Sequence, residues 1–142
     1  MYVPLVVRSA YSLFYGTRMP GEVVRYLHGL GYRTVALTDR NNLYGVHEFL
    51  ETCEEVGVRP IVGATVQKGR WEVVVLVKDE RGFSNLCRLL TRRMREEESF
   101  DLAEEIPLCA EGNAILCRDR ELLETWRGKV EDLSVWIQGL ER

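Results

Sequence analysis

The segment TVALTDRNNLYGVHEFLETCEEVGVRPIVG, residues 34–63, decides the fold. Its first four residues, Thr34 to Leu37, are mostly apolar and begin with β-branched side chains, which predicts a short strand buried on both faces. A helix follows, with Asn42 as its predicted N-cap and Gly57 as its end, because glycine enters the left-handed conformation at little steric cost. The next strand is predicted from Ile61 to Val66. Strand–helix–strand units of this kind close right-handed into parallel sheets, so the segment indicates an α/β fold.

Polar residues gather where two of the predicted strands end. Five of them, Thr38 to Asn42, follow the strand that ends at Leu37. A further strand is predicted from Val3 to Val7, and Arg8 and Ser9 come directly after it. Because α/β proteins keep their chemistry at the carboxyl ends of buried strands, we expect the candidate site at these two turns.

The remaining elements alternate in the same way along the chain. Further strands are predicted at Trp71–Lys78, Asn113–Cys117 and Leu133–Ile137, and further helices at residues 20–31, 83–94, 101–106 and 121–126. About six strands are therefore expected in a mostly parallel sheet, with one hairpin across the short link at residues 67–70. No linker-like composition divides the chain, so residues 1–142 are predicted to form a single domain. Because the last predicted strand has no helix after it, we expect a fragment of a longer protein, and whether the natural chain continues past Arg142 stays open.

The composition of the chain limits which partners, cellular location and cysteine chemistry can be expected. Apolar residues make up 46% and charged residues 29% of the chain, as in ordinary globular proteins. The net charge of −3 argues against strong nucleic-acid binding by this domain alone. No stretch is long and apolar enough to span a membrane, and no signal peptide precedes the first strand, so a cytoplasmic location is predicted. The cysteines show no C-x-x-C pair, which predicts free buried thiols at Cys53, Cys87, Cys109 and Cys117.

Four sequence motifs carry a resemblance to a known family. They are LVVRSAYSL at residues 5–13, ALTDRNNLYG at 36–45, PIVG at 60–63 and GFSNLCRLLT at 82–91. Together the first three resemble the N-terminal PHP (polymerase and histidinol phosphatase) domain of bacterial DNA polymerase III alpha subunits. The fourth is similar to a segment of the polymerase-type PHP domains. The resemblance covers nearly the whole chain, with the motifs in the same order.

The resemblance implies a distorted β/α barrel, here incomplete, with divalent metals at the carboxyl ends of the strands. Active members of the family hold these metals with a His-x-His after the first strand, an Asp-His after the second and a glutamate just past the Ile-Val-Gly. Imidazole and carboxylate groups suit a phosphoesterase, because the metals they bind polarise the phosphate and lower the pKa of a bound water.

This chain departs from that pattern at most of the positions concerned. The histidine positions hold Val6, Arg8 and Arg40, and the glutamate position holds Thr65, so that only Asp39 keeps a possible ligand. A guanidinium group has no lone pair for a metal. We therefore predict a lost metal site with a vestigial Asp39, no cofactor and no catalytic residue. The two histidines of the chain, which fall within predicted helices and off the motifs, are His28 and His47.

Three functions remain open from the sequence. The first is a non-catalytic structural or docking module, a pseudoenzyme in a polymerase III alpha-type protein of DNA replication or repair. Its partners would be the remainder of the alpha subunit or other replication proteins, and Arg8 and Arg40 would converge on Asp39 as an ion-pair cluster. The members of that predicted cluster are Arg8, Ser9, Asp39, Arg40, Asn41 and Thr65.

The second function is an anion- or phosphate-binding module built on Arg8 and Arg40. Its further donors are predicted to be Ser9, Ser12, Thr38, Asn41, Asn42 and Thr65. The third function is a metal-dependent phosphoesterase or 3′–5′ exonuclease, which the loss of ligands disfavours. The oligomeric state stays open.

Overall fold

The computed structural model describes residues 2–13 and 16–135. The chain forms two compact units, unit 1 at residues 1–65 and unit 2 at residues 66–142. Each unit has its own helices and strands. Within the described ranges, every helix is too short or too polar to cross a membrane.

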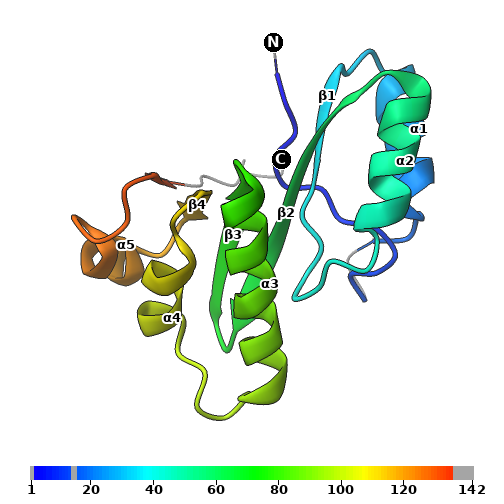
Figure 1. Cartoon of the computed structure of the whole chain (residues 1–142). Helices are drawn as coiled ribbons and strands as arrows, with labels where there is room; N and C mark the ends of the chain where they lie inside the picture. The colour runs from blue at the N-terminus through cyan, green and yellow to red at the C-terminus, as the bar shows by residue number, and fades with distance from the viewer. Residues whose placement is uncertain (1, 14–15, 136–142) are drawn as a thin grey trace, which may run out of the picture. The chain divides into compact units, whose positions relative to one another are not determined.

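Unit 1 contains the strand–helix–strand segment that the sequence predicts. Its elements are α1 at Pro20–Gly29, β1 at Thr34–Leu37, α2 at Val46–Val56 and the first part of β2, which spans Arg59–Lys68. β1 and β2 pair in parallel, with Thr34 opposite Arg59. Figure 1 shows α1 and α2 side by side, and both belong to one packed group of elements with β1. The buried side chains of this core are Val24, Val35, Leu37, Phe49, Cys53 and Val58.

The two ends of α2 show where local sequence decides and where it does not. Gly57 ends the helix with a φ of 76°, the left-handed conformation that the sequence predicts. The prediction of Asn42 as N-cap is wrong, because the helix begins at Val46 and its N-cap is Gly45. The side chain of Asn42 accepts a hydrogen bond from the Tyr44 N–H at 3.2 Å instead. An asparagine that closes such a turn is no longer available to cap a helix.

The predicted strand at Val3–Val7 is an extended segment and not a strand. It lies against β1, since the Ala36 N–H donates to the Pro4 carbonyl at 3.3 Å and the Thr38 N–H to the Val7 carbonyl at 2.8 Å. The two acceptors, Pro4 and Val7, are three residues apart, whereas the two donors, Ala36 and Thr38, are two residues apart. A regular parallel ladder needs equal spacing on both segments, so this ladder is interrupted. Pro4 also has no N–H to donate. Five strands are therefore described in place of about six.

Unit 2 contains the remaining strands and three helices. They are β3 at Trp71–Val77, α3 at Glu80–Arg95, α4 at Leu102–Cys109, β4 at Asn113–Cys117, α5 at Arg120–Trp126 and β5 at Leu133–Val135. β3 and β4 pair antiparallel, and β4 and β5 pair in parallel. The end of β2 lies in unit 2 and reaches β3 through the two-residue turn Gly69–Arg70, a length typical of a hairpin. Of the predicted last strand, residues 136 and 137 lie outside the described residues.

Helix α4 continues past the point where the sequence predicts its end. Pro107 lies inside the helix, although a proline has no N–H for the carbonyl four residues earlier. That carbonyl belongs to Ala103, and it accepts a hydrogen bond from Nε1 of Trp126 at 2.9 Å. The buried indole of α5 thus replaces the missing helical donor, which explains why the helix tolerates the proline.

Candidate functional site

Asp39 lies two residues beyond the end of β1 and is 2% exposed. Its Oδ1 accepts hydrogen bonds from the Ser9 N–H and from the Ser12 hydroxyl, both at 2.7 Å. Its Oδ2 accepts from the Ser9 hydroxyl at 2.6 Å. Hydrogen bonds to an ionised carboxylate are short and strong, and three of them offset the cost of burying the charge.

The two serine hydroxyls are fixed from the other side by the backbone. The Tyr11 N–H donates to Oγ of Ser9 at 3.2 Å, and the Arg40 N–H donates to Oγ of Ser12 at 2.9 Å. A hydroxyl has a single proton, and each of these bonds uses a lone pair of the oxygen. The proton of each serine is therefore left for the carboxylate of Asp39.

Thr65 lies within β2 and pairs with the segment that follows β1. Its N–H donates to the Asp39 carbonyl at 2.9 Å, and its carbonyl accepts from the Asn41 N–H at 2.8 Å. These bonds form a parallel bridge between Arg40 and Thr65, beyond the end of β1. The Thr65 hydroxyl donates to the Thr38 carbonyl at 2.9 Å. Asn41 has a φ of 56°, a left-handed conformation that asparagine tolerates better than most residues.

The structure thus brings together most of the predicted cluster through direct contacts. Ser9 and Asp39 are joined through their side chains, whereas Arg40 and Asn41 meet Thr65 through the backbone. Arg8 is half-buried and directly precedes Ser9. The convergence of the Arg8 and Arg40 guanidinium groups on Asp39 stays a prediction.

The serines and threonines of the predicted anion site have protein acceptors. Ser9 and Ser12 donate to Asp39, and the Thr65 hydroxyl donates to a carbonyl. The Thr38 hydroxyl lies 3.3 Å from the Leu5 and Val7 carbonyls. An anion at this place would have to displace these acceptors, so the hydroxyls give no support to the anion-binding alternative.

The role of Ser12 was missed from the sequence, which counted it only among donors to an anion. Its signal is the spacing Ser-x-x-Ser directly after an extended segment. The Ser12 N–H donates to the Ser9 carbonyl at 3.0 Å and closes a turn. This turn directs both serine hydroxyls toward Asp39. Hydroxyl residues commonly bond across such short spacings, but the distant acceptor is visible only in the fold.

The residues present do not fit the divalent metals that the family resemblance implies. Val6, Arg8, Arg40 and Thr65 provide no imidazole or carboxylate at the corresponding positions. Oδ1 of Asp39 already accepts two hydrogen bonds, which occupy both of its lone pairs. Across residues 2–13 and 16–135, no three His, Cys, Asp or Glu side chains come together as a possible metal site.

The four cysteines are free thiols, as predicted. Cys53, Cys109 and Cys117 are buried as predicted, whereas Cys87, which was also predicted to be buried, is half-buried. Burial raises the pKa of Cys53 to about 11 and that of Cys109 to about 12. A thiol with a raised pKa is protonated at neutral pH, and it is a poor nucleophile or metal ligand in that form.

Comparison with known proteins finds a matching domain family and relatives among bacterial DNA polymerases. The PHP domain family matches residues 4–140. An error-prone DNA polymerase of Rhodopirellula baltica is 32% identical over 146 residues, which cover 97% of this chain and 13% of that protein. The DNA polymerase III alpha subunit of Bacillus subtilis is 33% identical over 95 residues, which cover 62% of this chain and 8% of that protein.

Two solved structures share the fold at low sequence identity. A putative metal-dependent phosphoesterase from Bifidobacterium adolescentis has a TM-score of 0.64 and 12% identity, with 93% of this chain and 76% of that chain covered. An amidohydrolase from Chromobacterium violaceum has a TM-score of 0.64 and 13% identity, with 94% and 75% covered.

These comparisons confirm the predicted fold class, an α/β fold of the PHP type with an incomplete barrel. The chain spans 13% or less of the length of curated relatives such as the polymerases of R. baltica and B. subtilis. In those relatives the matching region is one part of a much larger polymerase. By its sequence motifs, its fold and the match over residues 4–140, this chain belongs to the PHP domain family.

Proposed function

We propose that this chain is the PHP domain of a polymerase III alpha-type protein in which the metal site is lost, and that it acts as a non-catalytic structural or docking module. The observation that carries this proposal is the state of Asp39. Its carboxylate is bound by Ser9 and Ser12 inside the protein and is 2% exposed.

The charges at the neighbouring positions support the same proposal. Arg8 and Arg40 put two fixed positive charges where the resemblance implies cations, and Val6 puts an aliphatic group where it implies a histidine. Positive side chains repel a divalent ion and have no lone pair to bind it. A phosphoesterase or exonuclease of the family type therefore lacks both its ligands and its electrostatic environment here.

The relatives suggest the setting in which the module works. Because the named relatives are polymerases many times the length of this chain, we place the domain in DNA replication or repair. Its partner in this proposal is the remainder of a polymerase alpha subunit, in the cytoplasm. Catalysis of nucleotide transfer then belongs to that remainder and not to the PHP domain.

Metal analysis tests the proposal most directly. The purified chain is incubated with excess Zn²⁺ or Mn²⁺, dialysed, and its metal content is measured by mass spectrometry. We expect less than about 0.1 metal ion per chain, because a single monodentate carboxylate holds such ions weakly. A metal-dependent phosphoesterase treated in parallel provides the positive control.

Hydrolysis of a generic phosphoester with the same metals provides the second measurement. No rate above the metal-only blank is expected. Stoichiometric metal, or a hydrolysis rate that Asp39→Ala abolishes, would overturn the proposal and restore the phosphoesterase hypothesis.

The docking role needs a separate experiment. The reading frame that follows the codon for Arg142 shows whether a polymerase region is encoded in the same chain. If it is, the two parts are expressed separately and their association is measured by calorimetry. We expect a saturable heat of binding, and its absence with two folded parts would contradict the docking role.

A further inference from the structure

Two segments about thirty residues apart in the sequence are joined at the carboxyl end of β1. Residues 9–12 contribute the Ser9 N–H and the two serine hydroxyls, and residues 39–42 contribute the carboxylate of Asp39. Two bonds run in the other direction, from the Arg40 N–H to Oγ of Ser12 at 2.9 Å and from Nδ2 of Asn42 to the Tyr11 carbonyl at 3.0 Å. The connection is reciprocal, so neither segment can move without breaking bonds of the other.

We propose that Ser9, Asp39 and Ser12 form a metal-independent hydrogen-bond network, called the Asp39 network, that holds residues 9–12 against the segment at the carboxyl end of β1. In the family resemblance, this is the place where cations bridge groups from several strands. In this chain a buried carboxylate and two hydroxyls make that bridge. The inference rests on the proposed loss of the metal site and adds which residues replace the metals as the structural link.

The charge of Asp39 explains why a network of side chains suffices. A buried carboxylate that loses a donor is left with uncompensated charge, so each of its hydrogen bonds is costly to break. Both serines are buried, at 0% and 1% exposure, and water therefore cannot take the place of a missing hydroxyl without entering the core. Opening the network therefore requires breaking hydrogen bonds to a buried carboxylate, and these bonds involve only protein atoms.

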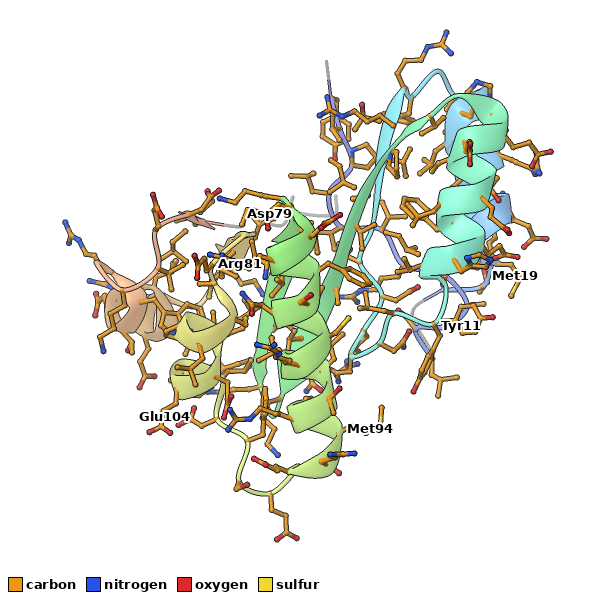
Figure 2. All side chains as sticks on the ribbon, in the orientation of Figure 1. Tyr11, Met19, Asp79, Arg81, Met94 and Glu104 are labelled. Carbon is orange, nitrogen blue, oxygen red and sulfur yellow. The ribbon has the colours of Figure 1, made fainter. Side chains whose placement is uncertain are left out.

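The network also determines the position of an exposed pair of aromatic rings, Tyr11 and Tyr44. The ring of Tyr11 lies over Gly45, where a Cβ would approach Cδ2 of Tyr11 to 3.1 Å. It contacts the ring of Tyr44 edge-on, with the ring centroids 6.3 Å apart. Figure 2 labels Tyr11, whose side chain extends from its loop toward solvent. The buried bonds of Ser9 and Ser12 therefore determine where this exposed aromatic pair is held.

Amide hydrogen exchange measured by NMR on the folded chain tests the Asp39 network. The informative amides are those of Ser9 and Arg40, which donate to Asp39 and to Ser12. In Ser12→Ala, the exchange rate of both is expected to rise about tenfold or more, since one buried hydrogen bond is worth about that factor. The Ile115 amide, which donates to the Asp132 carbonyl in unit 2, is expected to keep its rate.

A chelator separates this inference from the proposed function. EDTA is expected to leave the Ser9 and Arg40 exchange rates of the unchanged protein as they are. If EDTA raises these rates, a metal holds the segment, and both the inference and the proposed function are overturned. If EDTA has no effect but Ser12→Ala leaves both rates unchanged, the inference alone fails and the metal-free module stands.

Two further variants keep the test decisive. Ser99→Ala removes an exposed hydroxyl that contacts the Glu96 carbonyl, and it is expected to change neither rate. If Ser12→Ala accelerates Ile115 as well, the whole fold has loosened, and Ser9→Ala replaces it as the test. That variant removes the hydroxyl bond to Oδ2 of Asp39 and the acceptor of the Tyr11 N–H, but it keeps the bond from the Ser9 N–H to Asp39. An unchanged Arg40 rate in a folded Ser9→Ala protein would overturn the inference.

Discussion

Two aspartates lie at equivalent places after a strand in each unit, but one binds a distant segment and the other caps the next helix. Asp39 is the second residue after β1, and Asp79 is the second residue after β3. Asp39 is buried and accepts hydrogen bonds from residues 27 and 30 positions away. Asp79 is exposed at the start of α3 (Figure 2) and accepts from the Gly82 N–H at 2.8 Å, three positions along the chain.

The distance from each aspartate to the next helix explains the difference. Helix α3 begins at Glu80, so free helical N–H groups lie directly beside Asp79, and the carboxylate caps them. After Asp39 the helix begins only at Val46, and no helical N–H is near in sequence. The carboxylate is then satisfied by a segment that returns from the start of the chain. In this chain, the acid that a helix follows at once caps that helix, whereas the acid without an adjacent helix lies in the candidate site.

Removing each carboxylate in turn should distinguish the two roles. Of all the variants considered, Asp39→Ala is expected to lower the free energy of unfolding most. Asp39→Ala leaves three buried donors without an acceptor, and we expect it to lower the free energy of unfolding by about 3–5 kcal/mol. Asp79→Ala removes one exposed N-cap and should cost about 1 kcal/mol. Urea unfolding followed by circular dichroism measures both. Equal losses in the two variants would show that Asp39 is an ordinary surface acid.

A second contrast concerns how closely the helices of the two units are packed. Gly82 lies in the first turn of α3, where a Cβ would lie 1.9 Å from the Gly112 carbonyl oxygen, whereas a Cβ at Gly29 in α1 meets nothing within 4 Å. We expect Gly82→Ala to destabilise by about 1–3 kcal/mol through overpacking. Gly29→Ala should be neutral or stabilise by up to about 1 kcal/mol. Thermal unfolding of both variants measures the difference, and a tolerated Gly82→Ala would contradict the close approach.

Local patterns account for most of the fold that the sequence predicted. The spacing of apolar residues from Val46 to Val56 and the glycine after them specify α2, because both signals act within a few residues. The segment at residues 3–7 looks equally strand-like in isolation. Its hydrogen bonds to β1 are unevenly spaced, and that spacing depends on distant residues. The sequence could not reveal this interruption.

The candidate site divides in a similar way. Asp39 and Thr65 were predictable, because parallel strands bring their carboxyl ends to one edge of a sheet. The choice of Ser12 as a donor was not predictable, since it requires the turn at residues 9–12 to face Asp39. Asn42 illustrates the same limit, because its side chain could cap a helix or close a turn, and the Tyr11 carbonyl helps to decide between them.

Unit 2 contains a long-range bond of its own, from Trp126 to the Ala103 carbonyl, and its loss should have a smaller effect than the loss of Asp39. Trp126→Phe keeps a buried ring but removes the donor that replaces the N–H missing at Pro107. We expect a loss of about 1–2 kcal/mol in the free energy of unfolding, since one neutral acceptor is left without a partner. Urea unfolding gives the value.

A second background isolates the hydrogen bond from the change in ring size. In Pro107→Ala the alanine N–H can restore the helical bond to Ala103, so Trp126→Phe should cost about 1 kcal/mol less there than in the unchanged protein. Equal costs in the two backgrounds would attribute the whole effect to packing of the ring.

The thiols provide the smallest contrast between the units. Cys53 in unit 1 is fully buried, with its pKa raised from 9.0 to about 11 by desolvation, whereas Cys87 in unit 2 is half-buried. At pH 8 we expect a thiol reagent to modify Cys87 before Cys53, because access and the thiolate fraction both limit the reaction.

The folded-state pKa of Cys53 lies above its unfolded value, so the protonated thiol stabilises the fold fully below about pH 9. This contribution is lost as the pH rises from about 9 toward 11, since only the unfolded chain then ionises. Urea unfolding between pH 8 and pH 10.5 should therefore show a shallower decline in Cys53→Ala than in the unchanged protein. A matched Cys87→Ala control is expected to change the decline less, and an identical slope in all three proteins would contradict the buried state of Cys53.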